Sequence, residues 1–308
     1  MASRRKGRPI HGWLVIDKPS GLTSAAVIRI VRRTIGAAKA GHGGTLDPLA
    51  TGILPIALGE ATKTVGYAMD GFKSYVFTIR WGESRNTDDR DGVVTATTDV
   101  RPDPAAIAAV LPRFTGTIVQ TPPAFSAVKV DGRRAYDIAR ANEAVVLAPR
   151  EGLVEAIALV DRPDADHAVF EVRCGKGVYM RSLARDIAAA LGTLGHVSAL
   201  RRLRVGPFRE DQALSLAAVR EMDADALLER HLLPLAAAMP DVPAIALTEI
   251  EARRLQHGQP IATLPVASRS HAERLYRDAV VYATSSGRPV ALAQIKGGEI
   301  RPLRVLNV

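Results

Sequence analysis

The sequence predicts an α+β protein with a small β-rich domain at its C-terminal end. Residues 74–81 alternate large apolar side chains with more polar ones, which is the pattern of a half-buried β-strand. Residues 24–35 and 179–191 instead carry apolar stripes at helical spacing. A segment interrupted by prolines, 234–243, separates these elements from a final stretch of short β-like runs. We therefore assign the α+β class with a separate tail domain.

Length and composition set the domain plan. The 308 residues allow one large domain or two, and a hydrophobic content of 47% supports a proper core. We divide the chain into a basic flexible arm over residues 1–9, a large domain over residues 10–240 and a small domain over residues 244–308. The longest apolar region, 232–247, is broken by prolines and cannot span a bilayer as a helix.

The lack of a recognisable secretory signal and the low cysteine content favour a cytoplasmic protein. The basic start of the chain lacks a following apolar segment, so we expect no secretory signal and no membrane partner. Cys174 is the single cysteine, which excludes an internal disulfide and a Cys-rich zinc site.

The net charge of +9 suits a polyanionic partner, because each neutralised phosphate releases counterions. A basic protein that merely stays soluble is the alternative. Aromatic residues make up only 5% of the chain, which argues against a broad base-stacking platform. Recognition of a folded RNA by shape and phosphate contacts fits this composition better.

Local signals place the elements of the first half. The helix over 24–35 stops at Gly36, and the polar stretch 82–92 reads as a surface loop. A second helix is expected around 105–111. Residues 121–150 form an excursion from the body: two prolines break the chain, 124–130 can be a strand, Asp131-Gly132 is a hairpin signal, and a short helix ends near Arg140.

The second half continues with strands and helices and then the tail. The expected elements are strands at 153–159 and 168–174, a helix over 179–191 that stops at Gly192, a helical segment over 214–233, and short β-like runs at 278–283, 290–295 and 303–308.

The most informative stretch is 43–52, with sequence GGTLDPLATG. Its glycines let backbone approach a bulky ligand, and Pro48 pushes Asp47 out of the helical region into an extended conformation. The loop therefore presents one acid and leaves room beside it. An Asx-type turn, in which Asp47 bonds only to nearby backbone, is the plainer alternative.

Four motifs in register resemble the TruB family of tRNA pseudouridine synthases. They are GWLVIDKPSGLTS at 12–24, GHGGTLDP at 41–48 continuing to GEATK at 59–63, KSY at 73–75 and GVYMRSL at 177–183. Their order and spacing agree from about residue 10 to residue 205. The resemblance implies a catalytic domain built on a mixed or antiparallel sheet with a thumb-like insertion at 121–150, and a PUA-like RNA-binding β-barrel at the C-terminus.

The resemblance also implies the chemistry. Pseudouridine formation breaks the bond between ribose and N1 of uracil, turns the base and rejoins it through C5, so it requires no cofactor and no metal. Asp47 is the implied nucleophile; attack on the sugar, attack on C6 of the base and abstraction of a sugar proton all stay open. Arg181 would pair with Asp47 and hold it anionic. Tyr75 would stack on the uracil and help remove the C5 proton.

Plainer structural roles stand beside these assignments. Tyr75 can be an ordinary core tyrosine, Tyr179 a brace for its loop, and Arg181 a helix-start arginine that bonds phosphate or solvent. In the implied substrate-binding set, His42 is a wedge that replaces the flipped nucleotide, and Lys18 together with Pro19 buttresses the catalytic loop. Gly44, Thr45 and Tyr179 lie at the pocket. The implied phosphate contacts are Lys63, residues 201–204 and the thumb cations Lys129, Arg133, Arg134 and Arg140.

By resemblance, the substrate is uridine-55 in the TΨC stem-loop of tRNA, which must be flipped out of its loop before reaction. We expect a stand-alone monomer without a guide RNA, because guided relatives largely lack the thumb. A guide-dependent enzyme for ribosomal RNA and a non-catalytic tRNA-folding chaperone are the alternatives. A P-loop NTPase is excluded, since no lysine follows the glycines at Walker spacing.

Overall fold

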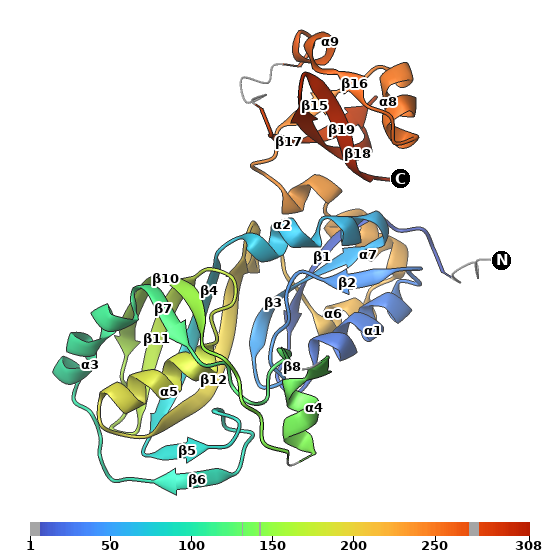
Figure 1. The fold of residues 1–308 in the computed structure, drawn as a ribbon. Helices are drawn as coiled ribbons and strands as arrows, with labels where there is room; N and C mark the ends of the chain where they lie inside the picture. The colour runs from blue at the N-terminus through green and yellow to red at the C-terminus, as the bar shows by residue number, and fades with distance from the viewer. Residues whose placement is uncertain (1–6, 131, 142, 271–276) are drawn as a thin grey trace.

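The computed structural model describes residues 7–130, 132–141, 143–270 and 277–308. Most of the predicted basic arm, residues 1–6, lies outside this part of the chain. Within it, a large body carries a smaller domain connected by a neck (Figure 1). No helix in the described ranges is both long and apolar enough to cross a membrane.

A mixed sheet forms the centre of the body. Its main path runs β14-β1-β3-β12-β4-β11-β10-β7, with β13 added on β12 and β2 on β3. The strands are β1 (Gly12–Lys18), β2 (Ala40–His42), β3 (Thr51–Leu58), β4 (Lys73–Trp81), β7 (Gly116–Gln120), β10 (Arg150–Asp161), β11 (His167–Cys174), β12 (Gly195–Val205), β13 (Phe208–Arg209) and β14 (Leu214–Ser215). All pairs in this sheet are antiparallel except β1 with β14 and β12 with β3.

The alternation predicted for β4 is confirmed. Tyr75, Phe77, Ile79 and Trp81 are all buried, whereas the residues between them are half-buried. Phe77 stacks on Phe170 of β11 with ring centroids 5.4 Å apart. One face of the sheet thus builds the main core.

Side-chain caps define the starts of several helices. Thr23 caps α1 (Ser24–Thr34) by accepting a hydrogen bond from the Ala26 N–H at 3.1 Å. Asp103 caps α3 (Pro104–Val110) in the same way. The helical segment expected over 214–233 is two helices, because Ser215 caps α6 (Leu216–Glu221) and Asp223 caps α7 (Ala224–His231). Other helical elements of the body are η1 (Gly59–Lys63), α2 (Val65–Asp70), η2 (Leu111–Phe114), α5 (Met180–Ala190), η3 (Glu210–Gln212) and η4 (Leu235–Ala238).

The excursion at 121–150 carries β8 (Lys129–Val130), β9 (Arg133–Arg134) and α4 (Ala135–Arg140). Figure 1 shows β8 and α4 in the lower middle of the view, apart from the main sheet. The strand expected over 124–130 is wrong in extent, since only residues 129–130 pair. The backbone carbonyls of residues 121 and 125 instead accept hydrogen bonds from side chains of α5. These contacts hold the segment before β8 against the helix, so it does not pair as a strand.

The smaller domain has its own curled sheet in the order β15-β17-β18-β19-β16 and its own apolar core. Its elements are β15 (Ala244–Ala246), α8 (Glu249–Gln256), β16 (Ile261–Ala262), α9 (Thr263–Ala267), β17 (Val280–Ser285), β18 (Arg288–Lys296) and β19 (Glu299–Val305). The last strand was expected at 303–308 but begins at Glu299, because Gly297 and Gly298 adopt positive φ and form a tight turn. The α+β class with a β-rich C-terminal domain is confirmed.

The two parts of the chain share a buried junction. Trp13 and Phe208 of the body pack together there, with ring centroids 5.0 Å apart. Tyr282, Leu292 and Leu306 of the smaller domain belong to the same apolar cluster. The small domain is thus packed directly onto the body.

Candidate active site

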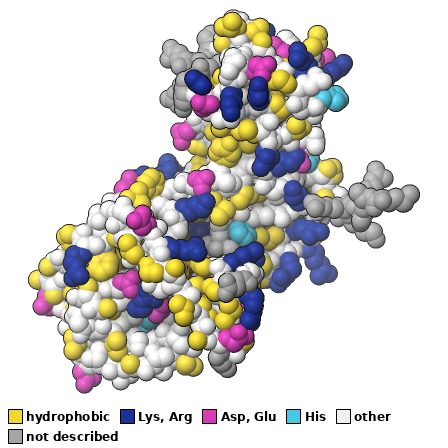
Figure 2. Space-filling model, viewed as in Figure 1, with side chains coloured by type: hydrophobic (Ala, Val, Ile, Leu, Met, Phe, Trp, Pro, Cys, Tyr) yellow, Lys and Arg dark blue, Asp and Glu magenta, His cyan; other side chains and the backbone are white. Residues whose placement is uncertain are grey.

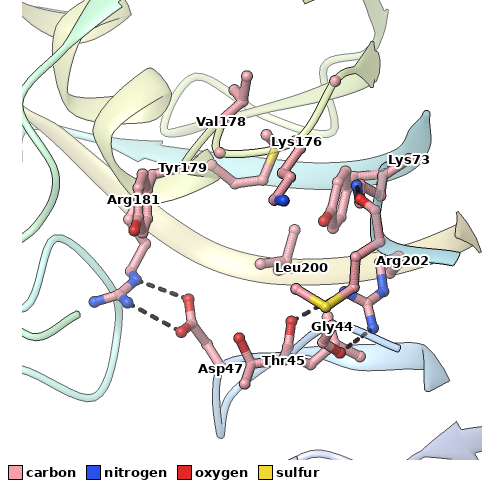
Figure 3. A pocket seen from close by; sticks show the side chains of 16 residues that line it. Gly44, Thr45, Asp47, Lys73, Lys176, Val178, Tyr179, Arg181, Leu200 and Arg202 are labelled. Carbon is pink, nitrogen blue, oxygen red and sulfur yellow. Dashed lines mark hydrogen bonds and ion pairs between the residues drawn. The ribbon is translucent and has the colours of Figure 1, made fainter. Parts of the chain in front are cut away.

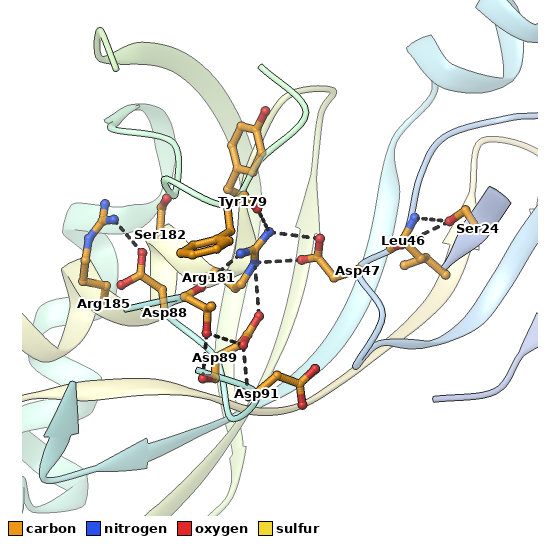
Figure 4. Close-up of polar contacts among 12 residues, drawn as sticks. Ser24, Leu46, Asp47, Asp88, Asp89, Asp91, Tyr179, Arg181, Ser182 and Arg185 are labelled. Atoms are coloured by element: carbon orange, nitrogen blue, oxygen red, sulfur yellow. Dashed lines mark hydrogen bonds and ion pairs between the residues drawn. The ribbon is translucent and has the colours of Figure 1, made fainter. Parts of the chain in front are cut away.

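The Asp47 loop connects β2 to β3 and is held by groups from three other elements. Ser24 of α1 grips Leu46 twice: its Oγ accepts from the Leu46 N–H at 2.9 Å and donates to the Leu46 carbonyl at 3.1 Å (Figure 4). Lys18 is fully buried and its Nζ donates to the carbonyls of Pro19, Leu22 and Pro48 at 2.9, 2.8 and 3.1 Å. These contacts fit the expected buttressing role, and burial lowers the pKa of Lys18 to about 8.

Arg202 supports the other side of this loop. Its guanidinium donates to the carbonyls of Gly44, Thr45 and Ile53 at 3.0, 3.0 and 2.8 Å, and the residue is 1% exposed. The expectation that Arg202 contacts phosphate is therefore wrong. Its neighbours are also engaged in the protein, since Arg201 pairs with Asp17 and Glu210, and Arg204 donates to the Gly206 carbonyl. Charge alone gave no sign that the middle arginine of this run points inward.

Asp47 and Arg181 form a two-point ion pair. Nε and Nη2 of Arg181 donate to Oδ2 and Oδ1 of Asp47 at 2.8 and 3.0 Å (Figures 3 and 4). The Arg181 side chain is 5% exposed, whereas that of Asp47 is 35% exposed. Among the described residues, no backbone N–H donates to the Asp47 carboxylate, so the simple Asx turn is not formed. The pair presents an accessible carboxylate backed by a buried cation.

Backbone carbonyls and a second acid hold Arg181. Its Nη1 donates to the Thr87 carbonyl and its Nη2 to the Phe125 carbonyl, both at 3.0 Å. Asp89 also lies close, with Oδ2 3.7 Å from the same Nε that donates to Asp47. A guanidinium with all of these partners has little freedom to leave Asp47.

The loop 82–92 contributes more to the site than its polar sequence indicated. Part of it is strand β5 (Glu83–Arg85), which pairs with β6 (Val94–Thr97). Asp89 is 5% exposed, and its Oδ1 accepts from Thr87 Oγ1 and the Asp91 N–H at 2.6 and 3.1 Å. Asp88 pairs with Arg185 of α5 at 2.9 Å. Burial raises the pKa of both Asp88 and Asp89. The reading as a plain surface loop is wrong, and only the fold brings these acids to Arg181.

A pocket of about 280 Å³ opens beside Asp47 (Figure 3). Gly44, Thr45, Asp47, Tyr75, Tyr179 and Arg181, all predicted from the sequence, line it together with Leu46, Met69, Lys73, Val178 and Leu200, which were not predicted. Tyr75 is 9% exposed, and burial raises the pKa of its phenol, which is therefore neutral near pH 7. Lys176 and Arg202 line the pocket as well, so the space is bounded by apolar and aromatic groups, one carboxylate and several cations.

His42 lies beside the loop but outside the pocket lining. Its Nδ1 accepts a hydrogen bond from the Gly44 N–H at 3.2 Å, which requires this nitrogen to be unprotonated. Burial and the nearby Arg202 lower the pKa of His42, so the neutral form is favoured. Its role as a wedge stays a prediction.

The remaining candidate cations lie away from the pocket. Lys129, Arg133 and Arg134 of the thumb are exposed. Arg133 makes a two-point pair with Glu143, both contacts at 2.9 Å. Lys63 Nζ contacts Glu60 at 2.5 Å and donates to the Val305 carbonyl at 2.7 Å, so it connects the body to the smaller domain. Contact of these residues with RNA stays a prediction.

Figure 2 shows Lys and Arg side chains gathered on the right-hand side of the body, below the smaller domain. Within the described ranges, no three His, Cys, Asp or Glu side chains gather as metal ligands. The site therefore offers a carboxylate, the guanidinium paired with it and further cations around one pocket.

Family profiles match nearly the whole chain. The profile described as TruB family pseudouridylate synthase (N terminal domain) matches residues 32–180. The profile of the tRNA pseudouridylate synthase B C-terminal domain matches residues 181–239, and that of Pseudouridine synthase II TruB, C-terminal, matches residues 243–306.

Individual relatives agree with these profiles. The tRNA pseudouridine synthase B of Rhodospirillum rubrum is 56% identical over 308 residues, covering 100% of both chains. That of Gluconacetobacter diazotrophicus is 54% identical, covering 98% of this chain and 99% of the relative. Among solved structures, the crystal structure of a Cbf5-Nop10-Gar1 complex superposes with a TM-score of 0.70 at 26% identity, covering 97% of this chain and 84% of that chain.

Proposed function

Because this chain belongs to the TruB family of pseudouridine synthases, we propose that it converts uridine-55 in the TΨC loop of tRNA to pseudouridine, with Asp47 as the catalytic nucleophile. The protein is a tRNA pseudouridine synthase, an isomerase. The specific position, the flipping of the base and the role of each residue are the proposal.

The two-point pair between Arg181 and Asp47 carries this proposal. The reaction breaks the glycosidic bond at N1 and forms a new bond from C1′ to C5; C5 loses its proton and N1 takes one up, so no atoms are gained or lost. A carboxylate can form the covalent intermediate that such an exchange needs. Asp47 is 35% exposed at the pocket, and Arg181 behind it keeps the carboxylate anionic and oriented.

The pocket suits one base rather than a duplex. Pockets for small ligands start at roughly 300 Å³, and this one measures about 280 Å³. We assign Tyr75 to stacking on the uracil and to helping remove the C5 proton, and Gly44, Thr45 and Tyr179 to shaping the pocket around it. A base in a folded loop must leave its stack to enter, at a cost of a few kcal/mol.

Contacts outside the pocket offset this cost. We assign Lys129, Arg133 and Arg134 of the thumb to the RNA backbone, and His42 to the space that the flipped nucleotide vacates. We also assign Lys63 and the smaller domain to contacts with the RNA. The net charge of +9 supports binding of an RNA at low salt.

We propose that the enzyme acts as a monomer without a guide RNA. The described part of residues 121–150 forms a thumb of its own, with exposed cations on β8 and β9. Guided action is the alternative, because the fold also resembles Cbf5, which is named together with Nop10 and Gar1 in its complex.

The test uses an unmodified tRNA transcript with no added cofactor, metal or guide RNA. Pseudouridine is mapped by chemical probing for the wild type and for Asp47→Asn, which keeps the shape of the side chain. Product at position 55 from the wild type alone supports the proposal. Tight binding without product from either protein would point to a chaperone or to a guided enzyme, and equal product from both would remove Asp47 from the mechanism.

A further inference from the structure

Helix α5 carries Arg181 in its first turn, yet its own sequence does not fix where the helix starts. The N-cap residue is Tyr179, and in the described structure α5 has neither a side-chain cap nor an acidic residue in its first turn. Ser, Thr, Asp or Asn would normally stand at this position and accept a hydrogen bond from the first turn. A helix that starts Val-Tyr-Met-Arg needs another element to define its first residue.

Gln120, the last residue of β7, holds the first residue of this helix start in place. Its Oε1 accepts from the Tyr179 N–H at 3.1 Å, and its Nε2 donates to the Tyr179 carbonyl at 3.3 Å. The same carbonyl accepts the first helical hydrogen bond, from the Leu183 N–H at 2.9 Å. Gln120 is 4% exposed, so its amide finds its partners in the protein. One side chain thus holds both backbone groups of the N-cap residue.

The chain that follows Gln120 continues along the same helix. The Thr121 carbonyl accepts from Ser182 Oγ at 2.7 Å and from Arg185 Nη2 at 2.9 Å. The Phe125 carbonyl accepts from Arg181 Nη2 at 3.0 Å. On the segment 120–125 these acceptors are backbone groups, so Gln120 is the residue of this segment whose contribution to the helix a substitution can remove.

We propose that Gln120 is a positioning residue that sets the start of α5 and thereby aims Arg181 at Asp47. The inference rests on the catalytic pair of the proposed function. A shift of the helix start by one residue moves side chains by about 1.5 Å along the axis and about 100° around it. Either displacement would break a two-point contact of 2.8 and 3.0 Å. Misplacement by about 1 Å can lower a rate on the order of 100-fold.

The first experiment compares Gln120→Leu with Val119→Thr. Leucine keeps the approximate size of the side chain and removes both hydrogen bonds. Val119 is the preceding residue on β7, is 65% exposed and keeps its β-branched shape as threonine. Single-turnover rates of total pseudouridine formation, tRNA dissociation constants and melting temperatures are measured for full-length proteins. We expect Gln120→Leu to slow the reaction at least about tenfold with tRNA affinity within about twofold, and Val119→Thr to match the wild type.

Combination with Arg181→Lys separates positioning from general support of the fold. If Gln120 acts through Arg181, Gln120→Leu should slow an Arg181→Lys enzyme by less than about twofold, because the two effects do not add when one residue acts through the other. A full additional loss in that background, or a rate loss that follows the fraction of unfolded protein, would overturn the proposal. So would an unchanged rate.

Gln120→Glu provides a second variant with a chemical signature. A protonated carboxyl presents one donor and one acceptor, as the amide does, whereas the ionised form can only accept. We expect the activity of Gln120→Glu relative to wild type to rise as the pH is lowered from about 8 to about 6, because burial favours the protonated acid. A flat ratio, or failure of both Gln120 variants to fold, would reduce Gln120 to a role in stability and refute the proposal.

The assay also keeps this inference distinct from the proposed function. Total pseudouridine is counted wherever it forms, so a wrong target position leaves the Gln120 comparison intact. Asp47→Asn is measured alongside. Full activity of that variant would remove the catalytic pair itself, whatever Gln120 does.

Discussion

Asp47 accepts two hydrogen bonds from Arg181, at 2.8 and 3.0 Å, although 134 positions separate the two residues in the chain. The carboxylate comes from a glycine-rich loop, and the guanidinium comes from the first turn of helix α5. Because both partners are charged and the geometry is two-pronged, this contact is of the stronger kind found in proteins. It is the relationship on which the site depends.

Replacing Arg181 with lysine should slow pseudouridine formation by about 10- to 100-fold while tRNA affinity changes little. A lysine keeps the charge but cannot make the two parallel bonds or reach the carbonyls of Thr87 and Phe125, and hydrogen bonds to charged groups are worth about 1.5–3 kcal/mol. Single-turnover kinetics check this, with Arg220→Lys on the exposed face of α6 as the control. A normal rate would show that orientation of Asp47 does not depend on the guanidinium.

Gly52→Ala should lower the free energy of unfolding by clearly more than Gly21→Ala does. A Cβ at Gly52, where φ is +98°, would lie 2.2 Å from the Arg202 carbonyl oxygen. At Gly21, where φ is +85°, no described atom lies within 4 Å of such a Cβ. Backbone strain of about 1–2 kcal/mol is common to both, so urea unfolding should show about 1–2 kcal/mol for Gly21→Ala and clearly more for Gly52→Ala. Equal losses would mean that β3 can move away from β12 at little cost.

His42 should make stability depend on pH in the acid range. Burial lowers the pKa of His42 below its usual 6.5, so the unfolded chain binds a proton more readily than the folded one. The stabilisation from neutral His42 is complete above pH 6.5 and declines as the pH falls toward the folded-state pKa. The difference in unfolding free energy between wild type and His42→Gln should therefore decrease between pH 7 and pH 5. Urea titrations at both pH values measure it, and a constant difference would contradict the hydrogen bond to Gly44.

Lys129→Ala should weaken tRNA binding and make it less sensitive to salt. An exposed cation that contacts phosphate contributes about one unit to the slope of log K against log salt. Filter binding over a range of KCl concentrations gives this slope, and Arg220→Ala serves as a control outside the thumb. If affinity falls with an unchanged slope, Lys129 supports the thumb and does not touch phosphate.

Local patterns were sufficient for much of the fold. The alternation in β4 predicted a strand with one buried face, because side chains of a strand point alternately to its two sides. Apolar stripes at helical spacing predicted the helices α1 and α5. The motifs around Asp47, Tyr75 and Arg181 predicted residues that line one pocket, since their order along the chain carries the family resemblance.

Tertiary structure decided what each polar group does. Arg201, Arg202 and Arg204 look alike in the sequence, yet Arg202 alone of the three is buried, because the carbonyls of the Asp47 loop converge on it. Asp89 and Gln120 likewise acquire their roles from groups far away in the chain. A buried polar group must be matched by a partner, and that partner is set by which elements meet in space. The sequence by itself thus determined most of the strands and helices, the chemical types at the site and, through the family resemblance, the partnership of Asp47 with Arg181, whereas the support around that pair required the chain to be folded.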